Sequence, residues 1–194
     1  MLTYTTIPVG ILESNCYILS DNGALALVDC GIFNRAVREE VAAQGGDLRY
    51  ILLTHGHFDH VQGVASAKAA YPAAQVCIGA GDADGLKKPA VADMQLQDGD
   101  VIQLGGSTLR VLSTPGHTRG GVSYLIELER LLFTGDTLFY EEVGRDDLPG
   151  GDWPTLQASV RRLLALPGDC VVLPGHGQAS SLEHERACNP YVKR

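Results

Sequence analysis

The run Thr-His-Gly-His-Phe-Asp-His, residues 54–60, constrains the fold of this chain more than any other stretch. Imidazole and carboxylate are ligands that suit zinc, iron or manganese, and burying four such groups without partners would be costly. The chain must therefore either leave this run as a polar surface loop or fold so that cations meet it. The close spacing favours cations, so the first candidate metal ligands are His55, His57, Asp59 and His60.

Further histidines and aspartates follow apolar runs in the same way. The pairs are residues 51–53 with His55, 111–113 with His117, 131–133 with Asp136, and 171–173 with His176. Short apolar runs of this kind are typical of buried strands. Each strand then delivers a ligand at its C-terminal end, and short turns containing glycine let these ligands converge on one edge of a sheet.

The composition indicates one soluble globular domain spanning residues 1–194. A chain of this length can bury about 70% of its unfolded surface. Apolar residues make up 45% of the sequence and charged residues 20%, as in ordinary globular proteins. The net charge of -8 provides no basic surface for a phosphate backbone, so we expect no nucleic-acid partner.

The chain shows no signal for export or for a membrane. Its start lacks a basic segment followed by an apolar stretch, and no run of 18 apolar residues occurs. The five cysteines are odd in number and form no Cys-x-x-Cys pair, which favours reduced, mostly buried thiols. We therefore predict a cytoplasmic protein.

Strands and helices are predicted in mixed order. The expected strands are residues 2–9, 15–20, 24–28, 50–53, 76–78, 101–104, 108–113, 122–126, 130–133 and 170–173. One helix is expected after Asn34, a suitable N-cap, and ends before Gly45-Gly46. Two more helices are expected over residues 61–71 and 154–166. The first three strands indicate antiparallel hairpins, with Asn22-Gly23 as one turn. This pattern favours an α/β sandwich with helices covering both sheets over a doubly wound parallel sheet.

Three weaker patterns predict structure rather than chemistry. Residues 79–84, Gly-Ala-Gly-Asp-Ala-Asp, begin like a dinucleotide loop but lack the third glycine, so an ordinary loop is expected. His184 lies among charged residues and is interpreted as structural or solvated. A stripe at helical spacing is expected to face the core; it consists of Trp153, Leu156, Val160, Leu163 and Leu164.

The ligand spacing suits two metals rather than one. One pair of groups in the run at 55–60 can face each metal, His117 and His176 can each add a nitrogen, and Asp136 is the natural bridging carboxylate. Two divalent cations with two carboxylates and one hydroxide leave about one positive charge for a developing oxyanion. Such a hydroxide forms near neutral pH, and Asp59 and Asp136 are the candidate catalytic residues.

These motifs resemble the metallo-β-lactamase superfamily. The resemblance covers nearly the whole chain, from Asp29 through the run at 55–60 to the Pro-Gly-His-Gly segment at 174–177. It implies a four-layer αββα sandwich of two mixed sheets flanked by helices, with Asp136 bridging two metals and Asp29 supporting their ligands. The implied ligand sets are His55, His57 and His117 for the first metal, and Asp59, His60 and His176 for the second.

Within that superfamily the chain is most similar to short bacterial members of the glyoxalase II group. Residues 144–152 and 185–191 carry this likeness, which implies hydrolysis of S-lactoylglutathione or a related small acyl thioester. Full-length glyoxalase II has a C-terminal helical domain that holds glutathione, whereas this chain ends 18 residues after His176. Glutathione contacts are therefore not carried over. Arg145 is a candidate for binding a substrate carboxylate, with a salt bridge to a neighbouring aspartate as the alternative.

Several alternatives stay open at this point. Zinc is the expected metal, but the same nitrogen and oxygen ligands accept iron or manganese. Related persulfide dioxygenases use one iron at a subset of these ligands, and lactone or ester hydrolysis is compatible with the same fold. A non-catalytic metal-binding module is a further alternative. The oligomeric state is not predicted.

Overall fold

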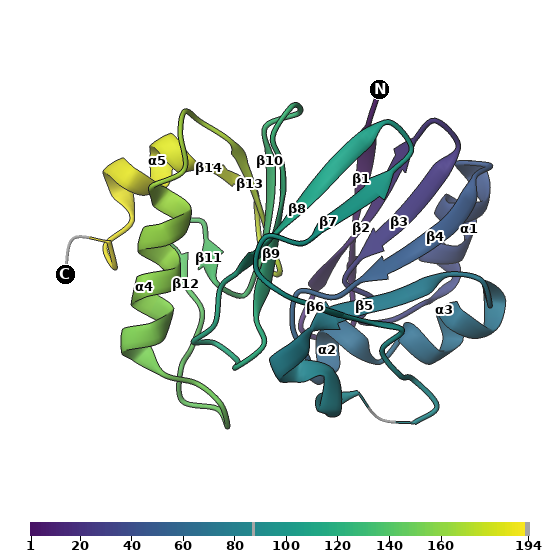
Figure 1. The fold of residues 1–194 in the computed structure, drawn as a ribbon, viewed down its shortest axis with the longest axis horizontal. Coiled ribbons are helices and arrows are strands. Elements are labelled where there is room, and N and C mark those ends of the chain that lie inside the picture. The colour runs from purple at the N-terminus through teal and green to yellow at the C-terminus, as the bar shows by residue number, and fades with distance from the viewer. Residues whose placement is uncertain (87, 193–194) are drawn as a thin grey trace.

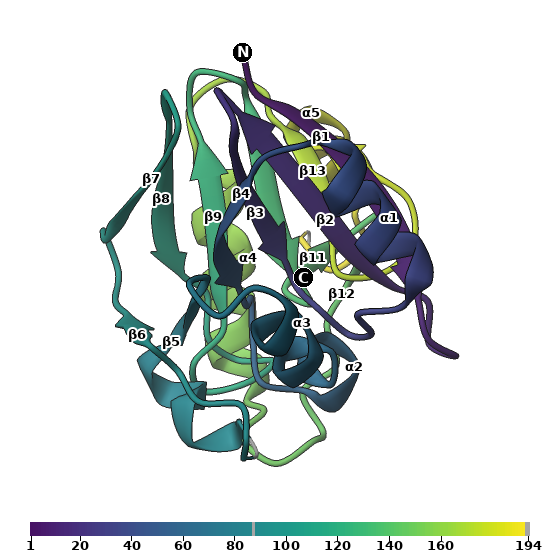
Figure 2. The ribbon, with the colours of Figure 1, turned by 90° about the vertical axis from the view of Figure 1, so that its right-hand side faces the viewer.

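The computed structural model describes residues 1–86 and 88–192, which form two mixed β-sheets packed face to face. Figure 1 shows helices α4 and α5 on one outer side and α1 and α3 on the other. In Figure 2, α1 and α3 lie in front of the sheets and α4 lies behind them. The four layers are therefore those of the predicted αββα sandwich.

The first sheet has the strand order β1-β2-β3-β4-β5-β6. Its strands are β1 (Thr3–Val9), β2 (Ser14–Asp21), β3 (Ala24–Val28), β4 (Asp47–Leu52), β5 (Gln75–Gly79) and β6 (Met94–Leu96). The first three strands are antiparallel, as predicted, and the later ones run parallel to β3. Asn22 and Gly23 both have positive φ, which the tight turn between β2 and β3 requires.

The second sheet has the order β14-β13-β10-β9-β8-β7, and only β10 and β13 pair in parallel. Its strands are β7 (Val101–Leu104), β8 (Ser107–Ser113), β9 (Val122–Ile126), β10 (Leu131–Gly135), β13 (Val171–Pro174) and β14 (Ser180–Ser181). A separate hairpin of β11 (Leu138–Phe139) and β12 (Glu142–Val143) follows β10. Each sheet thus mixes parallel and antiparallel pairs.

The helices cover the outer faces. They are α1 (Arg35–Ala43), α2 (Phe58–Val61), α3 (Val64–Ala70), α4 (Trp153–Leu164) and α5 (Leu182–Cys188), with a 3-10 helix η1 at Ala80–Gly85. Asn34 caps α1 as predicted, since its Oδ1 accepts the Val37 N–H at 3.1 Å. Within the described residues, no helix combines the length and apolar character needed to cross a membrane.

Three apolar layers hold the sandwich together. The layer between the sheets is centred on fully buried Tyr124 and Phe133, and the Phe133 ring lies edge-on to Tyr17 with centroids 5.1 Å apart. The other two layers join each sheet to its helices. The predicted stripe on α4 packs into one of these, with Leu156 and Leu163 fully buried. Four of the five free cysteines are buried, and Cys188 is exposed.

The predicted helix over residues 61–71 is wrong in one respect, because the structure contains two helices with a break at Gly63. The Cys30 N–H donates to the His60 carbonyl, and the Gly63 N–H donates to the Cys30 carbonyl, each at 2.8 Å. These bonds draw the chain against Cys30 and interrupt the helical ladder. A side chain at position 63 would overlap the backbone of Phe33 and Cys30.

Two further expectations need correction. Residues 79–84, predicted as an ordinary loop, mostly belong to the 3-10 helix η1, and the first of them ends β5. Strands β6, β11, β12 and β14 were not predicted, because runs of two or three residues carry too little alternation to be recognised.

Candidate metal centre

The predicted ligands meet at one edge of the sandwich, where strands of both sheets end. Asp29 follows β3 and the run at 55–60 follows β4, while the second sheet contributes His117 after β8, Asp136 after β10 and His176 after β13. The parallel pairing of β3 with β4, and of β10 with β13, places these chain ends on the same side. We call this edge the rim.

The side chains form two groups, each close enough to hold one cation. His55, His57 and His117 form the first group, and Asp59, His60 and His176 form the second, with the ligand atoms of each group within 4.8 Å of one another. His57 Nδ1 lies 2.9 Å from His117 Nε2, and His60 Nε2 lies 3.2 Å from His176 Nε2. Each group therefore matches one of the two predicted ligand sets.

Asp136 lies between the two groups. Its Oδ1 is 3.5 Å from His60 Nε2, and its Oδ2 is 3.5 Å from His117 Nε2. Position 175 must be glycine for this arrangement, because a Cβ there would overlap Asp136 Oδ1. A bridging role for Asp136 stays a prediction, and its position suits that role.

Hydrogen bonds to backbone carbonyls determine which nitrogen of two histidines faces the rim. His117 Nδ1 lies 2.7 Å from the Arg145 carbonyl, and His176 Nδ1 lies 2.9 Å from the Leu12 carbonyl. A carbonyl oxygen only accepts, so both Nδ1 atoms must donate. In the neutral rings each Nε2 then presents a lone pair to the rim.

The same reasoning applies to His55 and His60 through Asp29. His60 Nδ1 donates to Asp29 Oδ2 at 2.8 Å. The Thr54 hydroxyl donates to that same oxygen at 2.8 Å, so it must accept from His55 Nδ1, which lies 3.1 Å away. His55 Nε2 consequently points into the rim, where it is buried and has no hydrogen-bond partner among the described residues.

The polar atoms that face one another at the rim fit a pair of cations. The lone pairs of His60 and His176 face each other at 3.2 Å, and Asp136 Oδ1 is also buried without a hydrogen-bond partner among the residues described. Such an arrangement is repulsive unless a proton or a cation lies between the atoms. Histidine bonded through Nδ1 to a carboxylate or carbonyl is also the usual form of a metal-binding histidine.

The pKa shifts show how the rim behaves without a metal. Burial opposes a charge on His60, but the carboxylates of Asp29 and Asp136 outweigh it and raise the pKa of His60 to about 9. Burial, together with charge on neighbouring histidines, lowers the pKa of His55 and His57. Burial also acts to raise the pKa of Asp59, but the hydrogen bond with His176 lowers it overall. A proton on His60 thus occupies the place of a cation in the metal-free chain.

Asp29 and Arg145 have supporting contacts rather than rim contacts. Asp29, only 2% exposed, has a positive φ of 57° and binds His60 and Thr54 through its carboxylate. The strained backbone is therefore stabilised by the contacts that orient the ligands. The Arg145 side chain is exposed and pairs with Asp147 through two hydrogen bonds of 2.6 and 2.7 Å. Its backbone carbonyl, not its guanidinium, reaches His117.

His184 is more structured than a solvated residue. It is half-buried, its Nε2 lies 2.9 Å from Glu141 Oε1, and its ring stacks on Tyr140. His184, Glu141 and exposed Cys188 lie close together but outside the rim. The structural interpretation of His184 therefore agrees with these contacts.

Comparison with known proteins identifies the family of this chain. The family model described as the metallo-beta-lactamase superfamily matches residues 9–176. The chain belongs to this superfamily. The matched range contains every predicted metal ligand.

Curated relatives span the chain at moderate identity. The hydroxyacylglutathione hydrolase GloC of Haemophilus influenzae is 29% identical and aligns over 96% of both proteins. The probable metallo-hydrolase YqgX of Bacillus subtilis is 31% identical over 98% of both. The likeness to the superfamily is therefore shared along the whole chain and is not confined to the histidine run.

Solved structures of the superfamily superpose closely. The B3 metallo-beta-lactamase BLEG-1 has a TM-score of 0.90 at 30% identity, covering 99% of this chain and 100% of its own. The protein TTHA1623, solved in a di-iron-bound form, has a TM-score of 0.86 at 33% identity over 96% and 99%. ETHE1 from Myxococcus xanthus has a TM-score of 0.86 at 26% identity over 99% and 85%. This fold is therefore shared with a metallo-beta-lactamase and with a protein that binds two iron ions.

Sequence reasoning predicted Asp29 as a residue that supports the ligands, but it missed the other groups that orient them. Thr54 and the carbonyls of Leu12 and Arg145 were not among the predicted site residues, although each bonds to a rim histidine. The position of Thr54 beside His55 is a signal that could have identified it. Backbone carbonyls leave no mark in a sequence, so only the fold could show the other two.

Proposed function

We propose that this chain is a hydrolase that uses two divalent cations to cleave small acyl thioesters such as hydroxyacylglutathione. The observation that carries the proposal is the pair of facing nitrogens on His60 and His176, with Asp136 in contact with both ligand groups. The relative GloC, named a hydroxyacylglutathione hydrolase, supports the substrate class.

Each group of rim residues has its own proposed role. His55, His57 and His117 would hold one cation, Asp59, His60 and His176 the other, and Asp136 both. When bound, two cations would supply a water with a pKa of about 7 and polarise the substrate carbonyl. Asp59 and Asp136 orient that water by accepting its hydrogens. Attack of this water on the carbonyl carbon would form a carbon–oxygen bond and break the carbon–sulfur bond, while the proton lost by the water passes to solvent. The thiolate that leaves is a good leaving group, so the rim needs no strong general acid.

A cavity beside the first ligand group can receive part of the substrate. It has a volume of about 580 Å³ and is lined by His57 together with apolar Phe58, Val61, Leu86 and Ala90. Pockets of this size that are mostly apolar are typical of small-molecule sites. We place an apolar portion of the thioester here. Arg145 remains a proposed contact for a substrate carboxylate, which would compete with Asp147.

Zinc is the proposed metal. Imidazole nitrogens and carboxylate oxygens suit zinc, but iron and manganese accept the same ligands. The di-iron form of the relative TTHA1623 makes iron the main competitor.

An iron-dependent oxygenase is the second candidate. The structural likeness to ETHE1 favours it, and a single iron could use the first ligand group with Asp136. The second ligand group, which such an enzyme would not need, favours the hydrolase. Oxygen uptake with glutathione persulfide, together with one iron per chain, would support the oxygenase instead.

Metal analysis of the purified chain, paired with a hydrolysis panel, tests the proposal. The panel contains S-lactoylglutathione, shorter acyl thioesters, a lactone and a simple ester. We expect two metal ions per chain and fastest turnover with a thioester. Two metals with turnover only of the lactone or ester would reject the thioester substrate and leave the metal site intact.

A further inference from the structure

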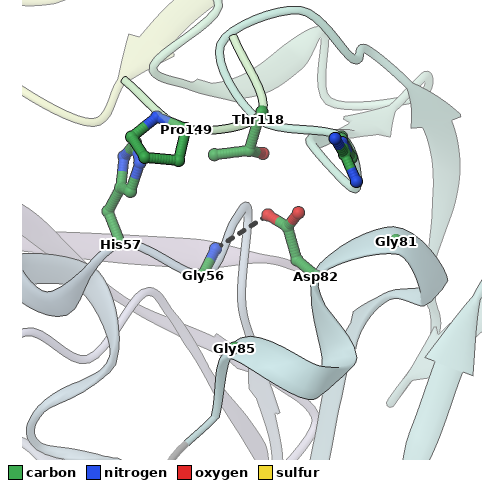
Figure 3. Close-up of a pocket in the computed structure, with 9 residues that line it drawn as sticks. Gly56, His57, Gly81, Asp82, Gly85, Thr118 and Pro149 are labelled. Carbon is green, nitrogen blue, oxygen red and sulfur yellow. Dashed lines mark hydrogen bonds between the residues drawn. The ribbon is translucent and has the colours of Figure 1, made fainter.

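We propose that Asp82 is a positioning residue that holds the first ligand group together. Its Oδ2 accepts the Gly56 N–H at 2.9 Å, and its Oδ1 accepts the Gly120 N–H at 2.7 Å. Figure 3 shows the Asp82 carboxylate directed at Gly56, with His57 next along the chain. This inference rests on the proposed metal site and adds a residue to it.

The two bonds join the loops that carry the first group. Gly56 lies between His55 and His57, so fixing its N–H fixes the peptide plane between two ligands. Gly120 follows His117 by three residues, on a loop from the other sheet. One carboxylate thus connects loops from both sheets. Asp82 itself is 9% exposed; its bond to Gly120 is buried, and its bond to Gly56 is part-buried.

Close glycine packing brings η1 near enough for these bonds. A Cβ at Gly79 would overlap the Gly120 carbonyl, and a Cβ at Gly120 would overlap the Asp82 N–H nitrogen. A side chain at Gly81 would crowd the backbone of Arg119. The glycines of residues 79–82 therefore serve a direct backbone contact with the His117 loop, and not a phosphate.

The second ligand group has a direct carboxylate contact through Asp29, which reaches the first group only indirectly, through Thr54 and His55. Asp29 binds His60 directly and also binds Thr54, whereas the Asp82 carboxylate accepts hydrogen bonds from backbone N–H groups of the two first-group loops. We therefore infer that loss of Asp82 weakens the first metal site and spares the second. A purely structural role would weaken both sites together.

The test compares Asp82→Asn with Asp84→Asn. An amide nitrogen cannot accept a hydrogen bond, so Asp82→Asn leaves one loop N–H without its partner. Asp84 lies on the same 3-10 helix but is exposed, so its variant makes the same charge change without that loss. Each variant is placed in a His176→Ala chain, which retains the first group, and in a His57→Ala chain, which retains the second.

Zinc affinity is measured by competition with a coloured chelator, and cobalt(II) absorption reports the coordination geometry. In the His176→Ala chain, we expect Asp82→Asn to weaken zinc binding by about 10-fold or more and to alter the cobalt bands, in line with other residues that orient metal ligands. In the His57→Ala chain, the same substitution should change the affinity less than twofold. Asp84→Asn should behave like its parent in both chains.

Equal weakening in both chains, or no weakening in either, would overturn the role of Asp82. Weakening of the same size from Asp84→Asn would also overturn it, because charge alone would then explain the effect. If the chain without any substitution binds no metal, the proposed function and this inference are both overturned. If the chain without any substitution binds two metals but Asp82→Asn does not selectively weaken the first site, only this inference fails and the proposed function stands.

Discussion

The two ends of the sandwich use buried carboxylates in different ways. Strand β3 begins beside Asp21 and ends beside Asp29, so these aspartates lie at opposite ends of the sheet. At the first end, which we call the turn end, Asp21 lies against the turn between β7 and β8. At the rim, Asp29 supports histidines that face one another.

The difference lies in how the buried polar atoms are satisfied. Asp21 Oδ2 accepts the Gly106 N–H at 2.8 Å and the Ser107 hydroxyl at 3.0 Å, and Oδ1 pairs with the N-terminal ammonium at 3.1 Å. At the rim, His55 Nε2 and Asp136 Oδ1 have no hydrogen-bond partner among the described residues. Asp21 Oδ1 likewise makes no hydrogen bond among the described residues, but the N-terminal ammonium places a positive charge 3.1 Å from it. At the rim the described residues place only histidine nitrogens near Asp136 Oδ1, so the rim requires a proton or a cation.

The largest expected effect concerns turnover at the rim. Asp59→Ala removes an oxygen that orients water and contacts His176, so kcat for a thioester should fall about 100-fold or more. Asp21→Asn, at the turn end, should keep kcat within about twofold of that of the unaltered chain. Steady-state kinetics at saturating metal checks both values. Full activity in Asp59→Ala would indicate that the rim is not a hydrolytic centre.

Metal addition should stabilise the rim and leave the turn end unchanged. Zinc at about 100 times its dissociation constant contributes about 2.7 kcal/mol per site to folding. Two such sites contribute about 5.4 kcal/mol, so for a chain of this length we expect Tm to rise by about 10–20 °C over that of the chelator-treated protein. Differential scanning calorimetry measures the shift. Asp21→Asn should show the same increment; an increment lost in that variant would couple the two ends.

The turn end should affect stability without affecting metal binding. Asp21→Ala removes the acceptor of two hydrogen bonds, one from the Gly106 N–H and one from the Ser107 hydroxyl, which keeps Glu129 as its other acceptor. At about 0.5–1.5 kcal/mol for each bond, unfolding should cost about 1–3 kcal/mol less. Urea unfolding of the metal-free chain measures this loss. Zinc affinity should stay unchanged, and a parallel loss of metal binding would contradict the separation of the two ends.

The smallest effects should be opposite pH trends at the two ends of the metal-free chain. The pKa of His60 is raised from 6.5 to about 9, so its stabilisation is complete below pH 6.5 and is lost as pH rises through about 9. Burial acts to raise the pKa of Asp21, but bonds to the N-terminus and Ser107 lower it below 3.8. Its stabilisation is therefore present above pH 3.8 and is lost as pH falls further.

Two variants separate these trends. His60→Gln should flatten the loss of stability between pH 6.5 and 9, and Asp21→Asn should flatten the loss below pH 3.8. Urea unfolding at fixed temperature across the pH range reports each slope. If His60→Gln leaves the alkaline slope unchanged, another group carries that proton.

The sequence predicted the fold class and the placement of the candidate ligands because both depend on local patterns. Apolar runs marked the strands, and the histidines and aspartates directly after them marked the rim. The break at Gly63 could not be predicted, since it depends on bonds to Cys30, which is distant in sequence. Asp82 was visible in a glycine-rich segment, but its partners Gly56 and Gly120 are known only from the fold.

The number of metal ions held at the rim tests the central claim most directly. Calorimetric titration of the chelator-treated chain with zinc should show two ions per chain, and the His176→Ala chain should bind one. Binding of one ion or none by the unaltered chain would contradict the account, as would two ions in the His176→Ala chain.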